Sequence, residues 1–224
     1  MPPSLYGRVA IGVVVALVVF FVATHRPAPE RQLLPAADKP RDEPRTLFVF
    51  GPESSGTRFI ARALANASLP GAVWDGENPA CWRHGALVVQ HISLPWGSNC
   101  SKPMDYISRV NTCGEQKYGR IMPDIAETLR HFHSSRAVII TRDPGMTMRS
   151  VLRTHCSNRT RAELEHAAAL LSIEKALAAP DLRGRVLHLQ YEAFSAVPAY
   201  VWRQLKHFTG LEGPAPEFHS GNSF

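Results

Sequence analysis

The chain has 224 residues, of which 45% are hydrophobic and 20% are charged, a balance typical of a folded protein and not of a disordered one. Lysine and arginine exceed aspartate and glutamate by 25 to 19, and the formal net charge of +6 favours anionic ligands or membrane headgroups without choosing between them. The 15 glycines and 18 prolines show no triplet repeat, which excludes a collagen-like protein.

An uncharged apolar run, VAIGVVVALVVFFVAT, covers Val9–Thr24 and predicts a membrane-inserting helix. At 1.5 Å per residue such a helix spans roughly 24 Å, which suits a thin endomembrane. We favour an uncleaved signal anchor, with residues 1–8 as a short cytoplasmic tail. The alternative is the apolar part of a cleaved signal peptide, because Ala23 and Thr24 are small residues near its end.

Residues 25–45 carry five prolines and many charges, which predicts an extended stem; an ordered N-terminal arm of the domain is the alternative. Residues 46–224 are the expected luminal domain. We therefore expect a single-pass type II protein of the Golgi or another secretory membrane, anchored through its N-terminal helix.

All the cysteines follow the apolar run. None forms a CxxC pair, which argues against a zinc site. In an oxidising lumen they allow two disulfides in three possible pairings, whereas four free cysteines would indicate a cytosolic domain. The cysteines are Cys81, Cys100, Cys113 and Cys156, and N-x-S/T sequons at Asn66, Asn99 and Asn158 agree with a luminal domain.

Strand-like and helix-like segments alternate beyond the stem. The expected elements are a strand at Thr46–Phe50, a helix at Arg58–Ala67, a strand at Ala86–Gln90, a helix at Met122–His133, a strand at Ala137–Thr141, helices at Met146–His155 and Arg161–Ala179, a strand at Val186–Gln190 and a helix at Val197–Phe208. Residues 70–85 and 92–121 read as loops. This alternation predicts an α/β protein with three layers and a central, mostly parallel sheet. In such sheets ligands bind beyond the carboxyl ends of the strands.

The first expected strand is followed by Gly51-Pro-Glu-Ser-Ser-Gly-Thr-Arg58. Its glycine spacing is typical of a loop whose backbone amides, together with the following helix N-terminus, hold a phosphate or sulfate. The lysine of the ATP-binding motif G-x-x-x-x-G-K-[ST] is absent, because Thr57 stands in its place. ATP or GTP hydrolysis is therefore disfavoured. A tight strand-to-helix turn without a ligand is the alternative.

A second candidate anion motif follows the strand at Ala137–Thr141. Arg142 stands at the carboxyl end of that strand, Pro144 favours a helix start, and Ser150 lies about two turns into the helix. Arg142 and Ser150 can therefore converge on one anion, at the same sheet edge as the glycine-containing loop.

Together the two motifs resemble the nucleotide-binding signature of the sulfotransferase family, which uses 3′-phosphoadenylyl sulfate (PAPS). Ser54-Ser55-Gly56-Thr57-Arg58 is similar to the family's loop K/R-[SG]-G-[ST]-[TR], which holds the 5′-phosphosulfate. Arg142 and Ser150 match the spacing of the family's 3′-phosphate motif, and Tyr191-Glu192 resembles its Tyr-Glu element, which implies an adenine-side contact for Tyr191. The Gly-Thr-Arg ending resembles the membrane-bound branch, and the resemblance implies a P-loop-like fold.

The resemblance also suggests catalytic residues. Ser54 stands where most members carry a lysine or arginine, and Arg58 is the expected replacement for that positive charge. His91 resembles the histidine of the family's K-T-H-L-P element and is our preferred base, with Glu77 as the alternative. Glu53 is expected to order the loop.

The expected activity is sulfuryl transfer from PAPS to a hydroxyl or amine of a carbohydrate or a luminal protein. The alternatives are a sulfotransferase-like protein that binds the nucleotide but has impaired turnover, and a P-loop kinase of small molecules. We expect no metal, because His131 and His133 lack further ligands at suitable spacing, and no nucleic-acid partner.

Overall fold

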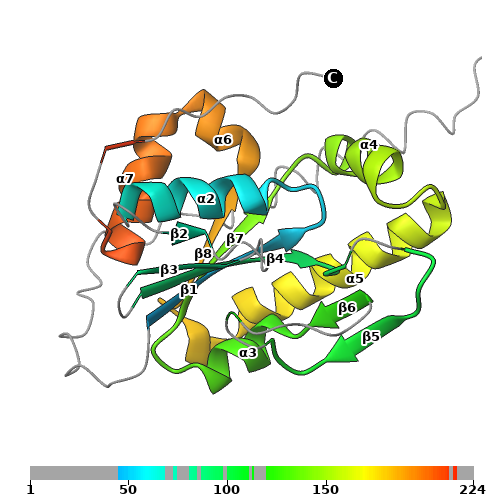
Figure 1. Ribbon diagram of the computed structural model, residues 1–224, viewed down its shortest axis with the longest axis horizontal. Coiled ribbons are helices and arrows are strands. Elements are labelled where there is room, and N and C mark those ends of the chain that lie inside the picture. Colours follow the sequence, from blue (N-terminus) through cyan, green and yellow to red (C-terminus); the bar gives the residue numbers. More distant parts are fainter. Residues whose placement is uncertain are drawn as a thin grey trace, which may run out of the picture. The chain divides into compact units, whose positions relative to one another are not determined.

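The computed structural model describes residues 45–68, 73–74, 81–84, 87–97, 100–110, 113, 120–211 and 214–215. A six-stranded sheet in the order β2-β3-β4-β1-β7-β8 forms its centre (Figure 1). Its strands are β1 (Arg45–Pro52), β2 (Val73–Trp74), β3 (Cys81–His84), β4 (Leu87–Leu94), β7 (Arg136–Thr141) and β8 (Val186–Gln190). A second sheet pairs β5 (Met104–Ile107) with β6 (Arg120–Pro123). The helices are α2 (Thr57–Ser68), α3 (Ile125–His131), α4 (Pro144–Thr154), α5 (Arg159–Ala178), η1 (Pro180–Leu182), α6 (Tyr191–Ala196) and α7 (Pro198–Thr209).

The predicted mostly parallel sheet is confirmed. Strands β4, β1, β7 and β8 run parallel to one another, whereas β3 is antiparallel to β4 and β2 is antiparallel to β3. The apolar runs of β1 and β7 are buried on both sides, which is the usual pattern of a strand covered by helices on both faces.

Helices cover both faces of the sheet, so the predicted three layers are present (Figure 1). On one face, Ile60 and Leu64 of α2 pack with Phe194 of α6 and Trp202 of α7. On the other face, helices α3 and α5 pack against the opposite side chains of β1 and β7 in a second core cluster, which includes Phe48. The two-residue period of β1 assigns its alternate side chains to these two clusters.

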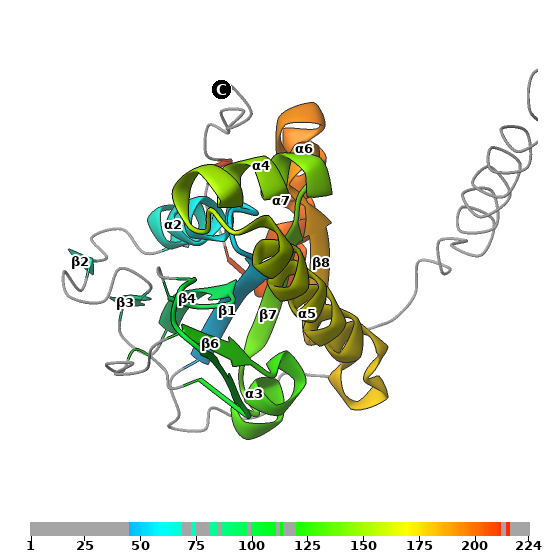
Figure 2. The ribbon, with the colours of Figure 1, turned by 90° about the vertical axis from the view of Figure 1, so that its right-hand side faces the viewer.

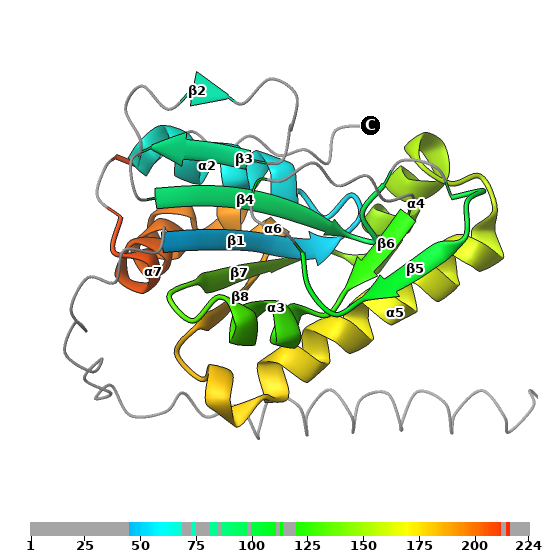
Figure 3. The ribbon, with the colours of Figure 1, turned by 60° about the horizontal axis from the view of Figure 1, so that its bottom comes forward.

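The strand register brings four chain segments to one edge of the sheet. Pro52 of β1 is level with Leu94 of β4, and Thr141 of β7 is level with Gln190 of β8. The arrowheads of β1 and β4 point toward α4 in Figure 3. The residues that follow β1, β4, β7 and β8 therefore meet at this edge, as predicted for the ligand site of an α/β sheet.

Helix α4 begins two residues before its predicted start because Asp143 and Pro144 form a capped first turn. The Asp143 side chain accepts a hydrogen bond from the Met146 amide at 2.8 Å, and Pro144 occupies the first turn, where its missing N–H is harmless. Asn158 caps α5 in the same way, and α7 ends at Gly210, whose φ is 69°. The residues that form these caps are neighbours in sequence, which is why the predicted ends of these helices lie within three residues of the observed ends.

Two predicted boundaries are wrong, and one short helix was not predicted. The strand predicted at Ala86–Gln90 continues to Leu94, because its pairing with β1 persists through Pro52. The helix predicted at Met122–His133 is strand β6 followed by α3, and Asp124 caps the break between them by accepting from the Glu127 amide at 3.0 Å. The helix predicted at Val197–Phe208 is confirmed as α7, within one residue at each end, whereas the short helix α6 before it was not predicted; Pro198 starts α7 as a separate helix.

The segments predicted as loops contain strands. Within residues 70–85, β2 and β3 extend the sheet beyond β4, and residues 92–121 include the end of β4, β5 and the first residues of β6. Strands of two to four residues carry too little periodicity to be recognised in the sequence, and they form because longer neighbours offer unpaired edges.

The predicted pairing of all four cysteines is confirmed, and the structure selects one of the three possible arrangements. Cys81 pairs with Cys113, and Cys100 pairs with Cys156. The second disulfide links the segment after β4 to the residues that join α4 to α5.

Among the helices that the structure describes, none is long and apolar enough to cross a membrane. The predicted anchor Val9–Thr24 lies outside the described residues, and so does the predicted stem at 25–45 except for Arg45, which is the first residue of β1 and not part of a stem.

Candidate functional site

The loop Gly51–Arg58 turns tightly between β1 and α2. Ser54 has a φ of 66° and Gly56 a φ of 91°, both in the left-handed region. A Cβ at Gly51 would lie 2.2 Å from the Ile140 carbonyl oxygen and 2.5 Å from Ser55 Oγ, so only glycine fits there. The loop delivers the chain to the N-terminus of a 12-residue helix, whose first amides lack intrahelical partners and attract anions.

The hydroxyl group of Ser55 is a further feature that suits an anion site. Its side chain is fully buried, and its Oγ has no hydrogen-bond partner in the described part of the chain. Leaving a buried hydroxyl unpaired costs roughly 1–3 kcal/mol, so such groups are usually satisfied by a ligand or a water molecule. An oxygen of a bound phosphate or sulfate would satisfy it.

Arg142 connects the second motif to the loop. Its Nη1 donates to the Ser54 carbonyl oxygen at 3.3 Å, and its guanidinium carbon lies 5.1 Å from the centroid of the Tyr191 ring. The three sequence elements predicted to surround one nucleotide are therefore in contact, although 88 residues separate Ser54 from Arg142.

Tyr191 lies between this arginine and the start of α2. The ring packs directly on Gly56 and lies 6.4 Å, centroid to centroid, from the edge-on ring of Phe59. Its neighbour Glu192 accepts a hydrogen bond from the Asp143 amide at 3.1 Å, which ties the end of β8 to the end of β7. The Tyr-Glu element thus supports both anion motifs.

Ser150 lies on α4, a helix next to the N-terminal end of α2 (Figure 2). It is half-buried, and the structure records no direct contact between its hydroxyl and Arg142 among the described residues. Thr147, one turn earlier, is fully buried with an unpaired Oγ1 and was missed by the sequence analysis. A hydroxyl at the first turn of a helix that follows an arginine is a weak signal, because threonine is common there.

His91 lies inside β4, and the prediction that it ends the strand is wrong, because β4 continues for three more residues. Its side chain is 6% exposed and its ring centroid lies 5.2 Å from that of Trp96. Burial, assisted by the positive charge of Arg58, lowers the pKa of His91 to about 4. The residue directly before Leu94-Pro95 is Ser93, so His91 stands two positions before the place that histidine has in K-T-H-L-P.

Of the two other predicted catalytic residues, the structure describes one. Arg58 is an exposed residue in the first turn of α2, and its charge reaches His91. Glu77 lies outside the described residues. Their predicted roles stay predictions.

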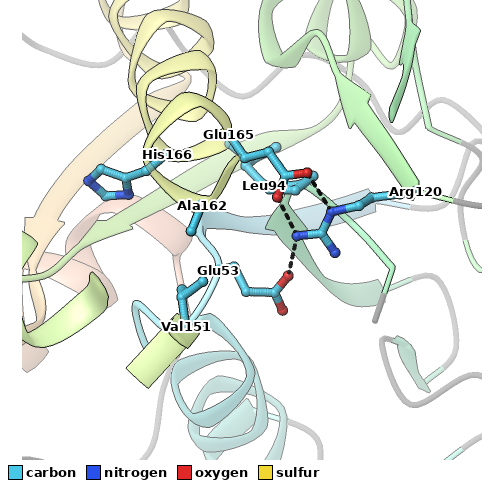
Figure 4. A pocket seen from close by; sticks show the side chains of 8 residues that line it. Glu53, Leu94, Arg120, Val151, Ala162, Glu165 and His166 are labelled. Carbon is cyan, nitrogen blue, oxygen red and sulfur yellow. Dashed lines mark hydrogen bonds and ion pairs between the residues drawn. The ribbon is translucent and has the colours of Figure 1, made fainter. Parts of the chain in front are cut away.

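A charge cluster that the sequence analysis missed lies next to the loop. Arg120 of β6 is 1% exposed, and its Nε and Nη2 donate to the two carboxylate oxygens of Glu165 at 3.0 and 2.6 Å. Its Nη2 also lies 3.6 Å from Glu53 Oε2 (Figure 4). Glu53 does order the loop as expected, because its amide donates to the Leu94 carbonyl oxygen at 3.0 Å. No local pattern indicates this cluster, because its members lie on three separate elements.

Within the described residues, no group of three histidine, cysteine or acidic side chains could hold a metal ion. His131 instead lies 2.7 Å from the Arg109 guanidinium.

No protein-family model matches the sequence, and no curated protein matches it. Two solved structures are similar to the chain. The structure of mouse sulfotransferase SULT7A1 complexed with PAP is 11% identical, with a TM-score of 0.44, over 78% of this chain and 61% of that chain. The structure of retinol dehydratase in complex with androsterone and inactive cofactor PAP is 16% identical, with a TM-score of 0.42, over 77% of this chain and 62% of that chain. The matched region spans about three fifths of each of these two proteins, and similarity at this level assigns no activity.

Proposed function

We propose that the chain is a sulfotransferase that moves a sulfuryl group from PAPS to a hydroxyl or amine of a carbohydrate or luminal protein. One observation carries the proposal: the loop that ends in Ser54–Arg58, Arg142 and Tyr191 form one contiguous site at the carboxyl edge of the sheet. The distances and packing of these residues suit a nucleotide with phosphate groups at both ends.

The residues present fit such a nucleotide. Ser55 Oγ is an unpaired buried group inside the phosphate-type loop, where the 5′-phosphosulfate would be held together with the amides of Gly56 and Thr57. Arg142 and the helix that carries Ser150 would hold the 3′-phosphate, and Tyr191 would contact the adenine side. When bound, PAPS supplies an activated sulfuryl group.

The loop lacks the cation that most sulfotransferases carry at position 54. We propose that Arg58 supplies this charge, since its side chain is close enough to His91 to depress that imidazole's pKa. The second candidate function, a nucleotide-binding protein with impaired turnover, rests on Ser54 itself. We further propose a type II membrane protein with a luminal domain, supported by the apolar segment Val9–Thr24 and by the two disulfides.

Binding of adenosine 3′,5′-bisphosphate (PAP) by the full-length chain in detergent tests the proposal. At a hundred times its dissociation constant, the ligand should stabilise the fold by about 2.7 kcal/mol, which raises Tm by roughly 5–10 °C for a domain of this size. Arg142→Ala should abolish the shift, whereas Arg183→Ala, an exposed arginine on the turn before β8, should keep it. A shift with ATP and none with PAP would favour the kinase alternative, and no shift with either would contradict the nucleotide site.

A further inference from the structure

The charge cluster of Glu53, Arg120 and Glu165 has no role in holding the nucleotide, yet Glu53 belongs to the nucleotide loop. We propose that Glu53 is the catalytic base that takes the proton of the acceptor during sulfuryl transfer. The assignment rests on the proposed function and deepens it.

The backbone holds Glu53 at the junction of two functional segments. Its amide hydrogen bond to the Leu94 carbonyl oxygen joins the nucleotide loop to the end of β4. Its side chain is 13% exposed and is directed toward Arg120 of β6 (Figure 4). The carboxylate therefore belongs to the loop that would hold the reacting sulfate and faces β6.

Arg120 lies close to the Glu53 carboxylate but makes no hydrogen bond to it. The Nε and Nη2 atoms of Arg120 are committed to Glu165, and its Nη1 donates to the carbonyl oxygen of Gly97. The separation of 3.6 Å between Nη2 and Glu53 Oε2 is too long for a hydrogen bond, and Oε2 is buried without a hydrogen-bond partner. Figure 4 shows this carboxylate turned toward Arg120, with the Arg120–Glu165 pair above it. One oxygen is thus left to accept a proton from a hydroxyl group.

A small cavity adjoins Glu53. Its volume is about 10 Å³, enough for about one water molecule or one hydroxyl group. Apolar side chains of Leu94, Pro95 and Val151 form part of its wall, and Arg120 and His166 also line it. A cavity of this size beside an unpaired carboxylate oxygen suits the hydroxyl of an acceptor better than a charged group.

The residues around Glu53 bring the pKa of its carboxyl group close to neutral pH. The charged and titratable groups around it are Arg120 from β6, Glu165 from α5 and His155 after α4, whose Nδ1 lies 3.6 Å from Glu53 Oε1. Burial raises the pKa of Glu53 to about 7 and outweighs the opposing effect of Arg120. A base works best when its pKa is close to the working pH, which favours Glu53 over His91, whose pKa is about 4.

In the proposed step, the acceptor oxygen forms a bond to sulfur while its proton moves to Glu53 Oε2. The bond between sulfur and the bridging oxygen of PAPS breaks, and its electron pair stays on that oxygen as PAP leaves. Glu53 then releases the proton to water. No oxidant, reductant or further co-reactant is needed.

The test compares the full-length chain with Glu53→Gln, which keeps the shape of the side chain but accepts no proton. Labelled PAPS is supplied with desulfated heparan oligosaccharide, with a tyrosine-containing peptide, and with water alone as acceptor. We expect Glu53→Gln to lower kcat by about 100-fold or more, while the Kd for PAP stays within about threefold, because Glu53 holds no phosphate. The wild-type rate should rise with pH around a midpoint near 7, and the variant should lose this dependence.

Two further variants make the result specific. Glu53→Asp keeps the carboxylate and should retain intermediate activity, whereas Glu163→Gln, on the exposed side of α5 and paired with Arg159, should match the wild type. The assignment is overturned if Glu53→Gln turns over like the wild type, if its activity falls only in proportion to PAP binding, or if the wild type binds PAP but transfers to none of the three acceptors. A wild-type chain that fails to bind PAP contradicts the proposed function itself, and the assignment fails with it.

Discussion

The ring of Tyr191 lies against Gly56 so closely that a Cβ at position 56 would meet two ring carbons at 2.5 Å. The guanidinium of Arg142 lies over the same ring. Tyr191 therefore links Gly56, directly before α2, to the arginine after β7, so these three residues pack as one unit at the candidate site.

Gly56→Ala should damage the site through this contact. The φ of 91° at Gly56 alone costs an alanine about 1–3 kcal/mol, and the ring contact adds to that cost. Gly184→Ala is the matched control, because Gly184 has a φ of 78° and open space where a Cβ would be. Urea unfolding should show a larger loss for Gly56→Ala, with PAP affinity lowered at least about tenfold. Equal losses of stability with normal PAP binding would refute the ring contact.

Arg58 and Ser54 provide a charge-exchange test of the proposed catalysis. Arg58→Ala should lower kcat by roughly 10²-fold if its cation stabilises the leaving group. Ser54→Lys should change the wild type little, because the positive charge is already supplied, yet it should restore activity in the Arg58→Ala background. The measurement is initial rates at saturating PAPS. A large gain from Ser54→Lys in the wild type would instead support the impaired-turnover alternative.

Arg120→Ala should be one of the most destabilising single changes. It leaves Glu53 without its cation, while Glu165 keeps only its pair with Arg161 at 3.0 Å, and breaking a buried pair in this way costs about 3–5 kcal/mol. Arg130→Ala, which breaks two exposed ion pairs, should cost far less, because water screens both pairs. Denaturant midpoints of the two variants give the comparison, and similar costs would mean that the cluster contributes little to stability.

Glu53 and His91 should make opposite contributions to the pH dependence of stability. The folded-state pKa of Glu53 is raised from 4.5 to about 7, so its contribution is present below pH 4.5 and is lost as the pH rises to 7. The folded-state pKa of His91 is lowered from 6.5 to about 4, so its contribution is present above pH 6.5 and is lost as the pH falls to 4. In the wild type the two slopes largely cancel between pH 4.5 and 6.5.

Glu53→Gln removes one of these slopes. Relative to the wild type, its free energy of unfolding should increase by up to about 3 kcal/mol between pH 4.5 and 8. Urea titrations at intervals of half a pH unit measure the difference in the free energy of unfolding between the variant and the wild type. The contributions of the other titrating groups are the same in both proteins and cancel in this difference. A difference that stays constant over this range would mean that Glu53 titrates as an ordinary exposed carboxylate.

The disulfide Cys100–Cys156 should stabilise both the fold and the site, because it links the end of β4 to the end of α4. Its cysteines have a sequence separation of 56, for which the loop-closure entropy of the unfolded chain predicts a stabilisation of about 4 kcal/mol. The double variant Cys100→Ser/Cys156→Ser should lose stability of that order and bind PAP more weakly. Cys81→Ser/Cys113→Ser, with a separation of 32 residues, should lose slightly less. Calorimetry checks both, and an unchanged Tm in the first variant would contradict the expectation.

Local sequence was sufficient for most of the elements around the nucleotide site. The apolar runs of β1, β7 and β8 and the helix start near Pro144 are patterns within a few residues, and each observed element begins within two residues of its predicted start. These patterns are visible in the sequence because they are formed by residues close to one another along the chain. The meeting of Arg142 with the loop followed because parallel strands end at one sheet edge.

Tertiary structure alone decided the rest. The full length of β4 depends on its pairing with β1, and β6 is held by pairing with β5 and with Trp96, so neither extent was visible as a periodic run. The pairing of the cysteines and the contact of Arg120 with Glu53 and Glu165 join residues 32 to 67 positions apart. Buried ion pairs leave no periodic trace in a sequence, because their stability comes from the exclusion of water and from charges contributed by distant segments. The sequence located the candidate anion site, and the fold decided which carboxylate is buried beside it.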